Sequence, residues 1–261
     1  MKVAAAQISC ALGNFDANLR KIRDFAARAK KSGAGLIVFP EMIDTGYSMP
    51  VIQRHAREWK NGAIVDLQKV AKENSIAIVA GISDRDGESI FNAQAFIDAT
   101  GEVLAKYRKT HLVTAAPLDE RVCLSPGNEF VTTKIDTFKV GLSICYDLRF
   151  PEMVRTLVVK HGANVVVNSS AWPVVRAEHL RILAVARAVE NQSYFVIANR
   201  VGTDDGVTFC GTSAIIDPSG KILASASSDR EELIEAEISD ERLDAARDSI
   251  RVFDHRRPDL Y

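Results

Sequence analysis

The chain has 261 residues, of which 47% are hydrophobic and 26% charged, and its formal net charge is −1 at pH 7. This composition is typical of a folded protein, and the charge gives no electrostatic reason to expect nucleic acid or an anionic membrane as a partner. Small molecules or other proteins remain, and the length suits one large α/β domain or two small ones.

The start of the chain and the cysteines bear on the compartment. Residues 1–7 read MKVAAAQ, too short and too soon polar for a signal peptide, and no apolar run approaches the about 18 residues of a membrane-spanning helix. No CxxC pair or His-flanked cluster occurs among the four cysteines, which are Cys10, Cys123, Cys145 and Cys210. This spacing favours reduced thiols in a cytoplasmic protein over disulfides or a zinc site, so we expect neither a metal nor another cofactor.

Apolar strands alternate with amphipathic helices through the first half of the chain. Hydrophobic periodicity predicts strands at 3–8, 36–39, 76–81, 91–98 and 103–107, and helices at 18–31 and 64–74. Residues 98–101 read Asp-Ala-Thr-Gly, a turn between the last two strands.

The second half repeats this order. Residues 138–145 echo the first strand, 163–168 follow a helix at 153–160 as 36–39 follow the first one, and 194–199 echo 76–80. Residues 211–223 then repeat the closing strand–turn–strand. Since no Pro/Gly/Ser-rich linker separates the halves, we predict a single pseudo-symmetric sandwich domain over residues 1–261.

Two stretches fall outside the repeat. Residues 113–137 are the only long irregular segment, and a loop of this length in a compact domain is usually functional. The tail 239–261 is charged at first and then carries apolar and aromatic residues. Rather than a floppy terminus, it indicates a segment that docks on a surface such as a second subunit.

Cys145 stands at a chemically favourable place. The apolar run 139–145 suits a buried strand, and Pro151 opens the helical run that follows it. Cys145 is therefore expected at the carboxyl end of a strand just ahead of a helix, where open α/β sheets bind ligands. A helix N-terminus directed at the sulfur would favour the thiolate. The position predicts a cysteine nucleophile.

Glu41 and Lys109 follow predicted strands in the same way, after the runs 36–39 and 104–108. We expect the repeat to bring these strand ends and Cys145 into one pocket, a set that suits acyl transfer without a histidine. Glu41 would accept the thiol proton and deliver it to a leaving amine, and Cys145 would form the acyl intermediate. Lys109 and a backbone N–H after Cys145 would face the developing oxyanion. Glu120, in the irregular stretch, would brace Lys109 or the substrate amide.

Several segments resemble the nitrilase superfamily of carbon–nitrogen hydrolases. The three that carry most of the resemblance are Phe39-Pro-Glu41, Tyr107-Arg-Lys109-Thr-His111-Leu and Cys145-Tyr-Asp147-Leu-Arg149-Phe-Pro-Glu152. Residues 187–191, 194–199 and 211–220 add to it, so the likeness covers almost the whole chain. The resemblance implies an α-β-β-α sandwich, a Glu-Lys-Cys triad, a second glutamate near the lysine, for which Glu120 is the nearest match, and a homodimer or higher homo-oligomer.

The residues after Cys145 bear on the substrate. True nitrilases resemble Cys-Trp-Glu, whereas Cys-Tyr-Asp is similar to the amidase branch, notably the ω-amidases that act on α-keto-acid amides such as 2-oxoglutaramate. Arg149 suits a substrate carboxylate through bidentate pairing, and Arg176 is a second candidate. The side chains predicted to line the pocket are Tyr47, Tyr146 and Trp172.

Other interpretations remain open. The same triad serves nitrile or N-carbamoyl hydrolysis, and the pocket also suits a non-catalytic small-molecule-binding or thiol-sensing protein. Arg149 has a structural alternative, pairing with Asp147 or Glu152. A Cys–His pair with His111 is disfavoured, because the triad already supplies a base.

Overall fold

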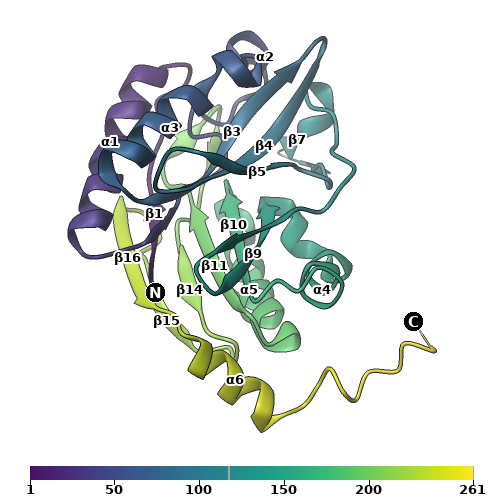
Figure 1. Ribbon diagram of the computed structural model, residues 1–261. Helices are drawn as coiled ribbons and strands as arrows, with labels where there is room; N and C mark the ends of the chain where they lie inside the picture. The colour runs from purple at the N-terminus through teal and green to yellow at the C-terminus, as the bar shows by residue number, and fades with distance from the viewer. Residues whose placement is uncertain (117, 261) are drawn as a thin grey trace.

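Two six-stranded sheets form the centre of the molecule (Figure 1). The computed structural model describes residues 1–116 and 118–260. The first sheet has the order β16 (Glu232–Glu237), β1 (Lys2–Gln7), β2 (Leu36–Val38), β3 (Ala77–Asp86), β4 (Ser89–Ile97) and β5 (Val103–Arg108). The second has the order β15 (Ile222–Ser225), β14 (Ala214–Ile216), β11 (Tyr194–Asn199), β10 (Val165–Ser170), β9 (Phe138–Ile144) and β8 (Thr132–Ile135).

The two sheets have the same internal topology. Strands β1, β2 and β3 are parallel and are followed by antiparallel β4 and β5. Strands β9, β10 and β11 are likewise parallel and are followed by antiparallel β14 and β15. The predicted repeat is therefore confirmed strand by strand.

The outer strands next to β1 and β9 come from different places in the chain. β16, which follows the second repeat along the chain, pairs antiparallel with β1 of the first sheet. β8, which directly precedes β9, pairs antiparallel with it as a hairpin. The second sheet is thus formed by one continuous stretch of chain, while the first is completed by a strand from near the other end.

Helices cover the outer faces of the two sheets. α1 (Phe15–Lys31) and α3 (Ala63–Asn74) lie on one side, and α4 (Pro151–Val159) and α5 (Ala177–Asn191) on the other (Figure 1). Alternate residues of β1 divide between the layers: Ala4 and Ala6 pack with α1 and α3, whereas Val3 and Ala5 pack toward the second sheet. Because both faces of the central strands are buried, they are apolar almost throughout. The predicted α-β-β-α sandwich is confirmed.

Element boundaries differ from the prediction where side-chain caps act. α1 begins three residues earlier than expected, because the Asn14 side chain accepts the Ala17 N–H and caps the helix there.

The stretch 113–137 is not wholly irregular, since its described residues contain four short elements: β6 (Thr114–Ala115), β7 (Leu118–Asp119), η2 (Glu120–Val122) and β8. The remaining short elements are α2 (Met49–His55), η1 (Trp59–Asn61), η3 (Cys145–Arg149), η4 (Val174–Arg176), β12 (Thr203–Asp204), β13 (Val207–Thr208) and α6 (Asp240–Ser249).

The first part of the C-terminal tail is a helix that packs on its own chain. The Gln192 side chain donates to the carbonyls of Ala246 in α6 and Ile250, at 3.0 and 2.7 Å. Beyond α6 the chain extends away from the sheets (Figure 1), and Tyr261, the end of the predicted docking tail, lies outside the described residues. Among the helices of the described residues, none has the length and apolarity needed to cross a membrane.

Candidate active site

The residues that follow strands β2, β5 and β9 lie close together in the interior of the sandwich. Glu41 follows β2, Lys109 directly follows β5, and Cys145 directly follows β9. Lys109 Nζ lies 2.8 Å from Glu41 Oε1 and 2.8 Å from Oε1 of Glu120, which begins η2. All four side chains are buried. The structure therefore brings together the four residues that the sequence singled out.

The Cys145 thiol is linked to Glu41 through one backbone group. The Ala171 N–H, just after β10, donates to Glu41 Oε2 at 2.8 Å, and the Ala171 backbone also acts to lower the pKa of the thiol. Cys145 itself has φ of 43°, a left-handed conformation that a non-glycine residue holds only when its surroundings impose it. The sharp turn carries the chain from β9 into η3.

Burial raises the pKa of the Cys145 thiol well above its ordinary value, and the nearby Glu41 charge adds to this, although Lys109 opposes it. The element after the strand is the five-residue turn η3, which begins at Cys145 itself, and the helix expected beyond it, α4, begins at Pro151. Desolvation is the largest influence on the pKa of the thiol. The thiol is protonated at rest, so its activation requires a base.

The pKa values of Glu41 and Lys109 are both raised, for different physical reasons. Burial raises the pKa of Glu41, and the Glu120 charge also raises it, while Lys109 pulls it down. For Lys109, burial acts to lower the pKa, but the charges of Glu120 and Glu41 outweigh it and raise the pKa well above its ordinary value. Lys109 is therefore a permanent cation between two carboxyl groups, and Glu41 is a carboxyl with increased proton affinity.

Asn92 completes this cluster and was not predicted from the sequence. Its Nδ2 donates to Glu41 Oε1 at 2.6 Å and to Glu120 Oε1 at 3.2 Å. Glu120 is fixed further by the Tyr47 hydroxyl at 2.9 Å and the Val113 N–H at 2.8 Å. The available signal was an asparagine in β4, a strand whose other polar residues are Ser89 and Gln94. Tyr47, predicted to line the pocket, instead lies behind it as a hydrogen-bond donor to Glu120.

A cavity of about 170 Å³ opens above Cys145. Its walls combine apolar side chains with two guanidinium groups. The lining residues are Val113, Ala115, Leu118, Cys145, Tyr146, Arg149, Trp172, Pro173, Arg176 and His179. Of the five residues predicted to bind substrate, Tyr146, Arg149, Trp172 and Arg176 thus face the sulfur across one small space.

Arg149 has no carboxylate partner among the described residues. Its guanidinium carbon lies 4.7 Å from the centroid of the Trp172 ring and 5.7 Å from that of Tyr146, and Nη2 is 3.4 Å from His179 Nδ1. Burial and the neighbouring Arg176 charge both lower its pKa. The structural alternative, pairing with Asp147 or Glu152, is not what the structure shows. The cavity mouth carries positive charge without a compensating acid.

Arg176 is fixed at the opposite wall. Its Nη2 donates to the Ala116 carbonyl at 2.9 Å, and its own carbonyl accepts the Trp172 indole N–H at 2.7 Å. No ion pair to Arg176 occurs in residues 1–116 or 118–260. An anionic substrate group entering the cavity would meet both guanidinium groups.

His111 lies away from this chemistry. Its Nδ1 is 2.8 Å from Asp147 Oδ1, and its ring stacks on Phe150 at a centroid distance of 3.8 Å. No group of three or more His, Cys, Asp or Glu side chains suited to a metal ion occurs in the part of the chain that the structure describes.

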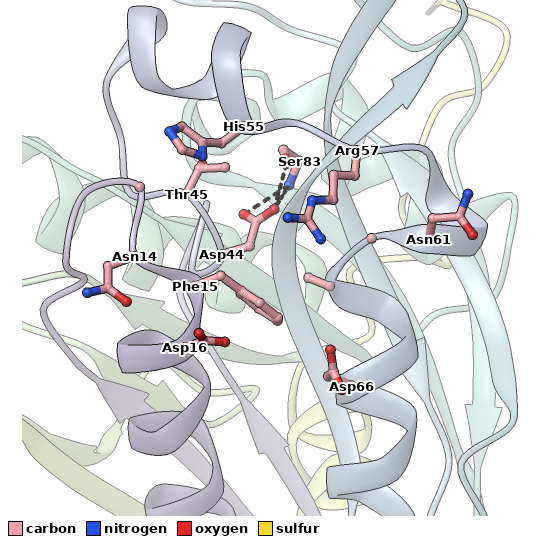
Figure 2. A pocket seen from close by; sticks show the side chains of 13 residues that line it. Asn14, Phe15, Asp16, Asp44, Thr45, His55, Arg57, Asn61, Asp66 and Ser83 are labelled. Carbon is pink, nitrogen blue, oxygen red and sulfur yellow. Dashed lines mark hydrogen bonds between the residues drawn. The ribbon is translucent and has the colours of Figure 1, made fainter.

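A larger cavity, of about 550 Å³, lies between the N-terminal ends of α1 and α3 and contains no cysteine (Figure 2). Two residues of its wall, Asp44 and Ser83, hold the segment that follows Glu41. Asp44, three residues after Glu41, accepts the Ser83 N–H at 3.0 Å and the Ser83 hydroxyl at 2.5 Å, as the dashed lines in Figure 2 show. These bonds hold the segment after Glu41 against β3.

Comparisons with known proteins agree with this geometry. Residues 2–248 match the model of the carbon-nitrogen hydrolase family. The 2-oxoglutaramate amidase of Bacillus subtilis (strain 168) is 36% identical over 99% of this chain and 98% of its own. A protein named nitrilase from Pyrococcus abyssi is 33% identical over 100% of this chain and 99% of its own.

A solved structure shows the same fold and a modified cysteine. It is a mutant of the amidase from Nesterenkonia sp. AN1 showing the result of Michael addition of acrylamide at the active-site cysteine. That structure superposes with a TM-score of 0.86 at 29% identity, covering 96% of this chain and 98% of its own. Because these matches span nearly its whole length, we conclude that the chain belongs to the carbon–nitrogen hydrolase family, within the nitrilase superfamily that its motifs resemble.

Proposed function

We propose that this protein is an amidase that cleaves the C–N bond of a small linear amide through a thioester on Cys145, releasing ammonia and a carboxylic acid. The observation that carries the proposal is the contact of Lys109 with both Glu41 and Glu120 at 2.8 Å, directly beneath the cavity that Cys145 lines. An acid, an amine and a thiol in one buried site provide every group that acyl transfer requires.

The acylation half follows from the protonation states. Glu41 takes the proton of the Cys145 thiol as the sulfur attacks the amide carbon, and a C–S bond forms while the carbonyl oxygen gains negative charge. Lys109 and the backbone N–H after Cys145 stabilise that oxygen. Glu41 then returns the proton to the nitrogen, the C–N bond breaks and ammonia leaves.

The hydrolysis half reverses these roles. With ammonia gone, Glu41 takes a proton from a water molecule that attacks the thioester carbon, and the carboxylic acid forms as the C–S bond breaks. The Cys145 sulfur recovers its proton from Glu41, so atoms and protons balance over one turnover. Glu120, Asn92 and Tyr47 hold the two catalytic charges in place and exchange no proton with the substrate.

The preferred substrates are ω-amides of dicarboxylic acids such as 2-oxoglutaramate. Support comes from Arg149 and Arg176, which bring two positive charges to the cavity without an acidic partner among the described residues, and from the relative named 2-oxoglutaramate amidase. Cation–π contacts with the rings of Tyr146 and Trp172 keep the Arg149 guanidinium at the cavity wall. A substrate carboxylate there would place the distal amide toward Cys145.

Nitrile hydrolysis is the second candidate, favoured by the relative named nitrilase. The same triad would also serve N-carbamoyl hydrolysis, which releases carbon dioxide together with ammonia. A non-catalytic role in small-molecule binding or thiol sensing is the third, and the burial of Cys145 at 5% exposure disfavours sensing by direct contact with bulk oxidants.

The test compares butyramide, which is neutral, with glutaramate, which is anionic, using released ammonia as the readout, alongside a nitrile and an N-carbamoyl compound. Cys145→Ala should abolish turnover of every substrate. Arg149→Met should raise KM for glutaramate by about 10- to 100-fold, since a charge-assisted hydrogen bond contributes about 1.5–3 kcal/mol, and leave butyramide nearly unchanged. Arg176→Met is the matched variant on the opposite wall.

Two results would reject parts of this proposal. Unchanged turnover in Cys145→Ala would end the thioester mechanism. An equal rise of KM for both amides in Arg149→Met would end the carboxylate clamp while leaving the amidase intact.

We also propose that the protein is cytoplasmic and a homodimer or higher homo-oligomer. The four free cysteines support the compartment. The oligomer is supported by exposed apolar residues on η4 and α5, namely Val174, Val175, Ile182 and Val189.

A further inference from the structure

Asp147 is a fully buried carboxylate that none of the catalytic steps uses. It lies two residues after Cys145 and accepts hydrogen bonds from two separate segments of the chain. Oδ2 accepts the Ile144 N–H at 2.9 Å and the Tyr107 hydroxyl at 2.7 Å. Oδ1 accepts the His111 N–H at 3.2 Å, the Thr110 hydroxyl at 3.3 Å, and lies 2.8 Å from His111 Nδ1.

On one side these bonds act on the turn that carries the nucleophile. Ile144 immediately precedes Cys145, whose φ of 43° is unfavourable for a side chain with a Cβ. The bond from the Ile144 N–H closes the turn between the end of β9 and η3. Loss of this bond would remove one local contact that keeps the backbone of Cys145 in the left-handed region.

On the other side they act on the segment that carries the amine. Tyr107 precedes Lys109 by two residues and His111 follows it by two, and both bond to the same carboxylate. The residues on either side of Lys109, one through its side-chain hydroxyl and one through its backbone N–H, are therefore bonded to the turn of Cys145. Tyr107 and Thr110 also bond to each other, at 3.0 Å between their hydroxyl oxygens, which closes the network.

We propose that Asp147 is a positioning residue that fixes the Cys145 sulfur relative to the Lys109 ammonium, and that it acts on the rate of acyl transfer rather than on substrate binding. The inference rests on the proposed function, in which both groups must face one carbonyl. A carboxylate is required because both of its oxygens face a backbone N–H. An asparagine has the same shape, but in either orientation its NH₂ group would oppose one of those N–H donors.

The experiment uses the full chain and three variants. Asp147→Asn should lower kcat by about 100-fold, as expected for a displacement of reacting groups by about 1 Å, while KM changes little. Tyr107→Phe removes one donor without creating a clash, and should lower kcat by about three- to tenfold. The matched control is Asp217→Asn, because Asp217 is also buried and accepts the N–H groups of Ser219 and Lys221, but in the turn between β14 and β15.

A second readout separates this inference from the amidase proposal. The rate at which iodoacetamide alkylates Cys145, measured by mass spectrometry, reports the position and environment of the sulfur without any amide turnover. Asp147→Asn should change that rate by about tenfold or more, whereas Asp217→Asn should leave both the alkylation rate and kcat at their wild-type values.

The outcomes are distinct. A folded Asp147→Asn variant with wild-type kcat and alkylation rate overturns the inference, as does a loss of kcat of equal size in Asp217→Asn. If Asp147→Asn does not fold, wild-type kcat in Tyr107→Phe overturns it instead. Failure of the wild-type chain to hydrolyse any amide rejects the proposed function, while the alkylation rates still decide the role of Asp147.

Discussion

Glu41 is subject to two opposing influences, and the balance between them sets the working pH. Its carboxyl group is buried, which favours the protonated form, yet the Lys109 ammonium lies 2.8 Å away and favours the charged form. Burial and the second carboxylate, Glu120, prevail, so the pKa is raised. A raised pKa suits a group that must both take and return a proton.

The pH dependence of the rate should report this directly. The ionised fraction of Glu41 falls as the pH falls through its raised pKa, so kcat/KM for butyramide should decline at a pH above the ordinary carboxyl value of 4.5. No alkaline decline is expected from Lys109, whose pKa is raised well above 10.5. The pH–rate profile is measured together with circular dichroism, which shows that the protein stays folded at each pH. An acidic midpoint of kcat/KM at or below 4.5 in folded protein would contradict the assignment of Glu41 as the base.

The sequence located the reacting residues and, in Glu120, one residue that holds them, but not Asn92 or Asp147. Glu41, Lys109 and Cys145 were identifiable because each follows an apolar run and stands in a motif that resembles a family signature. Asn92 stands inside a strand, where one polar residue has many explanations. The contacts of Asp147 join segments about forty positions apart in the chain, and periodicity carries no information about such pairs.

At the level of elements, the close approach of two strands places the base. β3 passes directly beneath the segment that follows β2, and the Gly81 N–H donates to the Pro40 carbonyl at 3.0 Å. A Cβ on Gly81 would lie 2.6 Å from Glu41 Cα and 2.8 Å from the Pro40 oxygen. Only glycine permits this approach, so β3 determines where Glu41 lies.

Gly81→Ala should therefore displace the base. We expect kcat to fall by about 100-fold and the free energy of unfolding to fall by about 1–3 kcal/mol, the cost of overpacking a buried contact. The control is Gly87→Ala in the β3–β4 turn, where a Cβ meets nothing within 4 Å although φ is 59°. It should lose stability but keep kcat, and an equal loss of kcat in both variants would show that the effect is not local to Glu41.

Element prediction succeeded where burial alone decides the structure. β11 has the predicted bounds, and the central strands were found because both of their faces are apolar. The hairpin of β12 and β13 and the short helix α2 were missed. Both are stabilised by contacts between segments far apart in the chain. The Tyr47 N–H and the Ser48 hydroxyl, just before α2, bond to Asp204 of β12 and to Asp205 at 2.8 and 2.9 Å, and no local sequence pattern reveals such pairs.

For the whole molecule, the segment beyond α6 offers a test of the proposed assembly. Phe253 packs between Arg155 and Arg247 of its own chain, at 5.6 and 5.8 Å from the guanidinium carbons. His255 and Arg256 line a pocket together with Pro151 and Glu152 of α4, and the end of the chain extends away from the sheets (Figure 1). We propose that this end contacts a second copy.

Removing residues 255–261 should shift the oligomer toward a single truncated chain, slightly lighter than the 28.6 kDa of the full chain, while Phe253 and the contacts of α6 with its own chain are retained. Sedimentation equilibrium measures the mass, and an unchanged thermal transition at low protein concentration shows that the fold survives. A full-length chain that sediments at 28.6 kDa would reject the proposed oligomer, and an unchanged oligomer after truncation would reject the role of the tail.

The pairing of β16 with β1 has a consequence for the unfolding of the molecule. The second sheet is built from one continuous stretch, β8 to β15, whereas the first sheet takes its outer strand from residues near the far end of the chain. A fragment that ends before Thr132 would therefore leave the edge of β1 unpaired and open to aggregation. Because the last strand of the chain belongs to the sheet of the first half, the two halves should melt together in one transition.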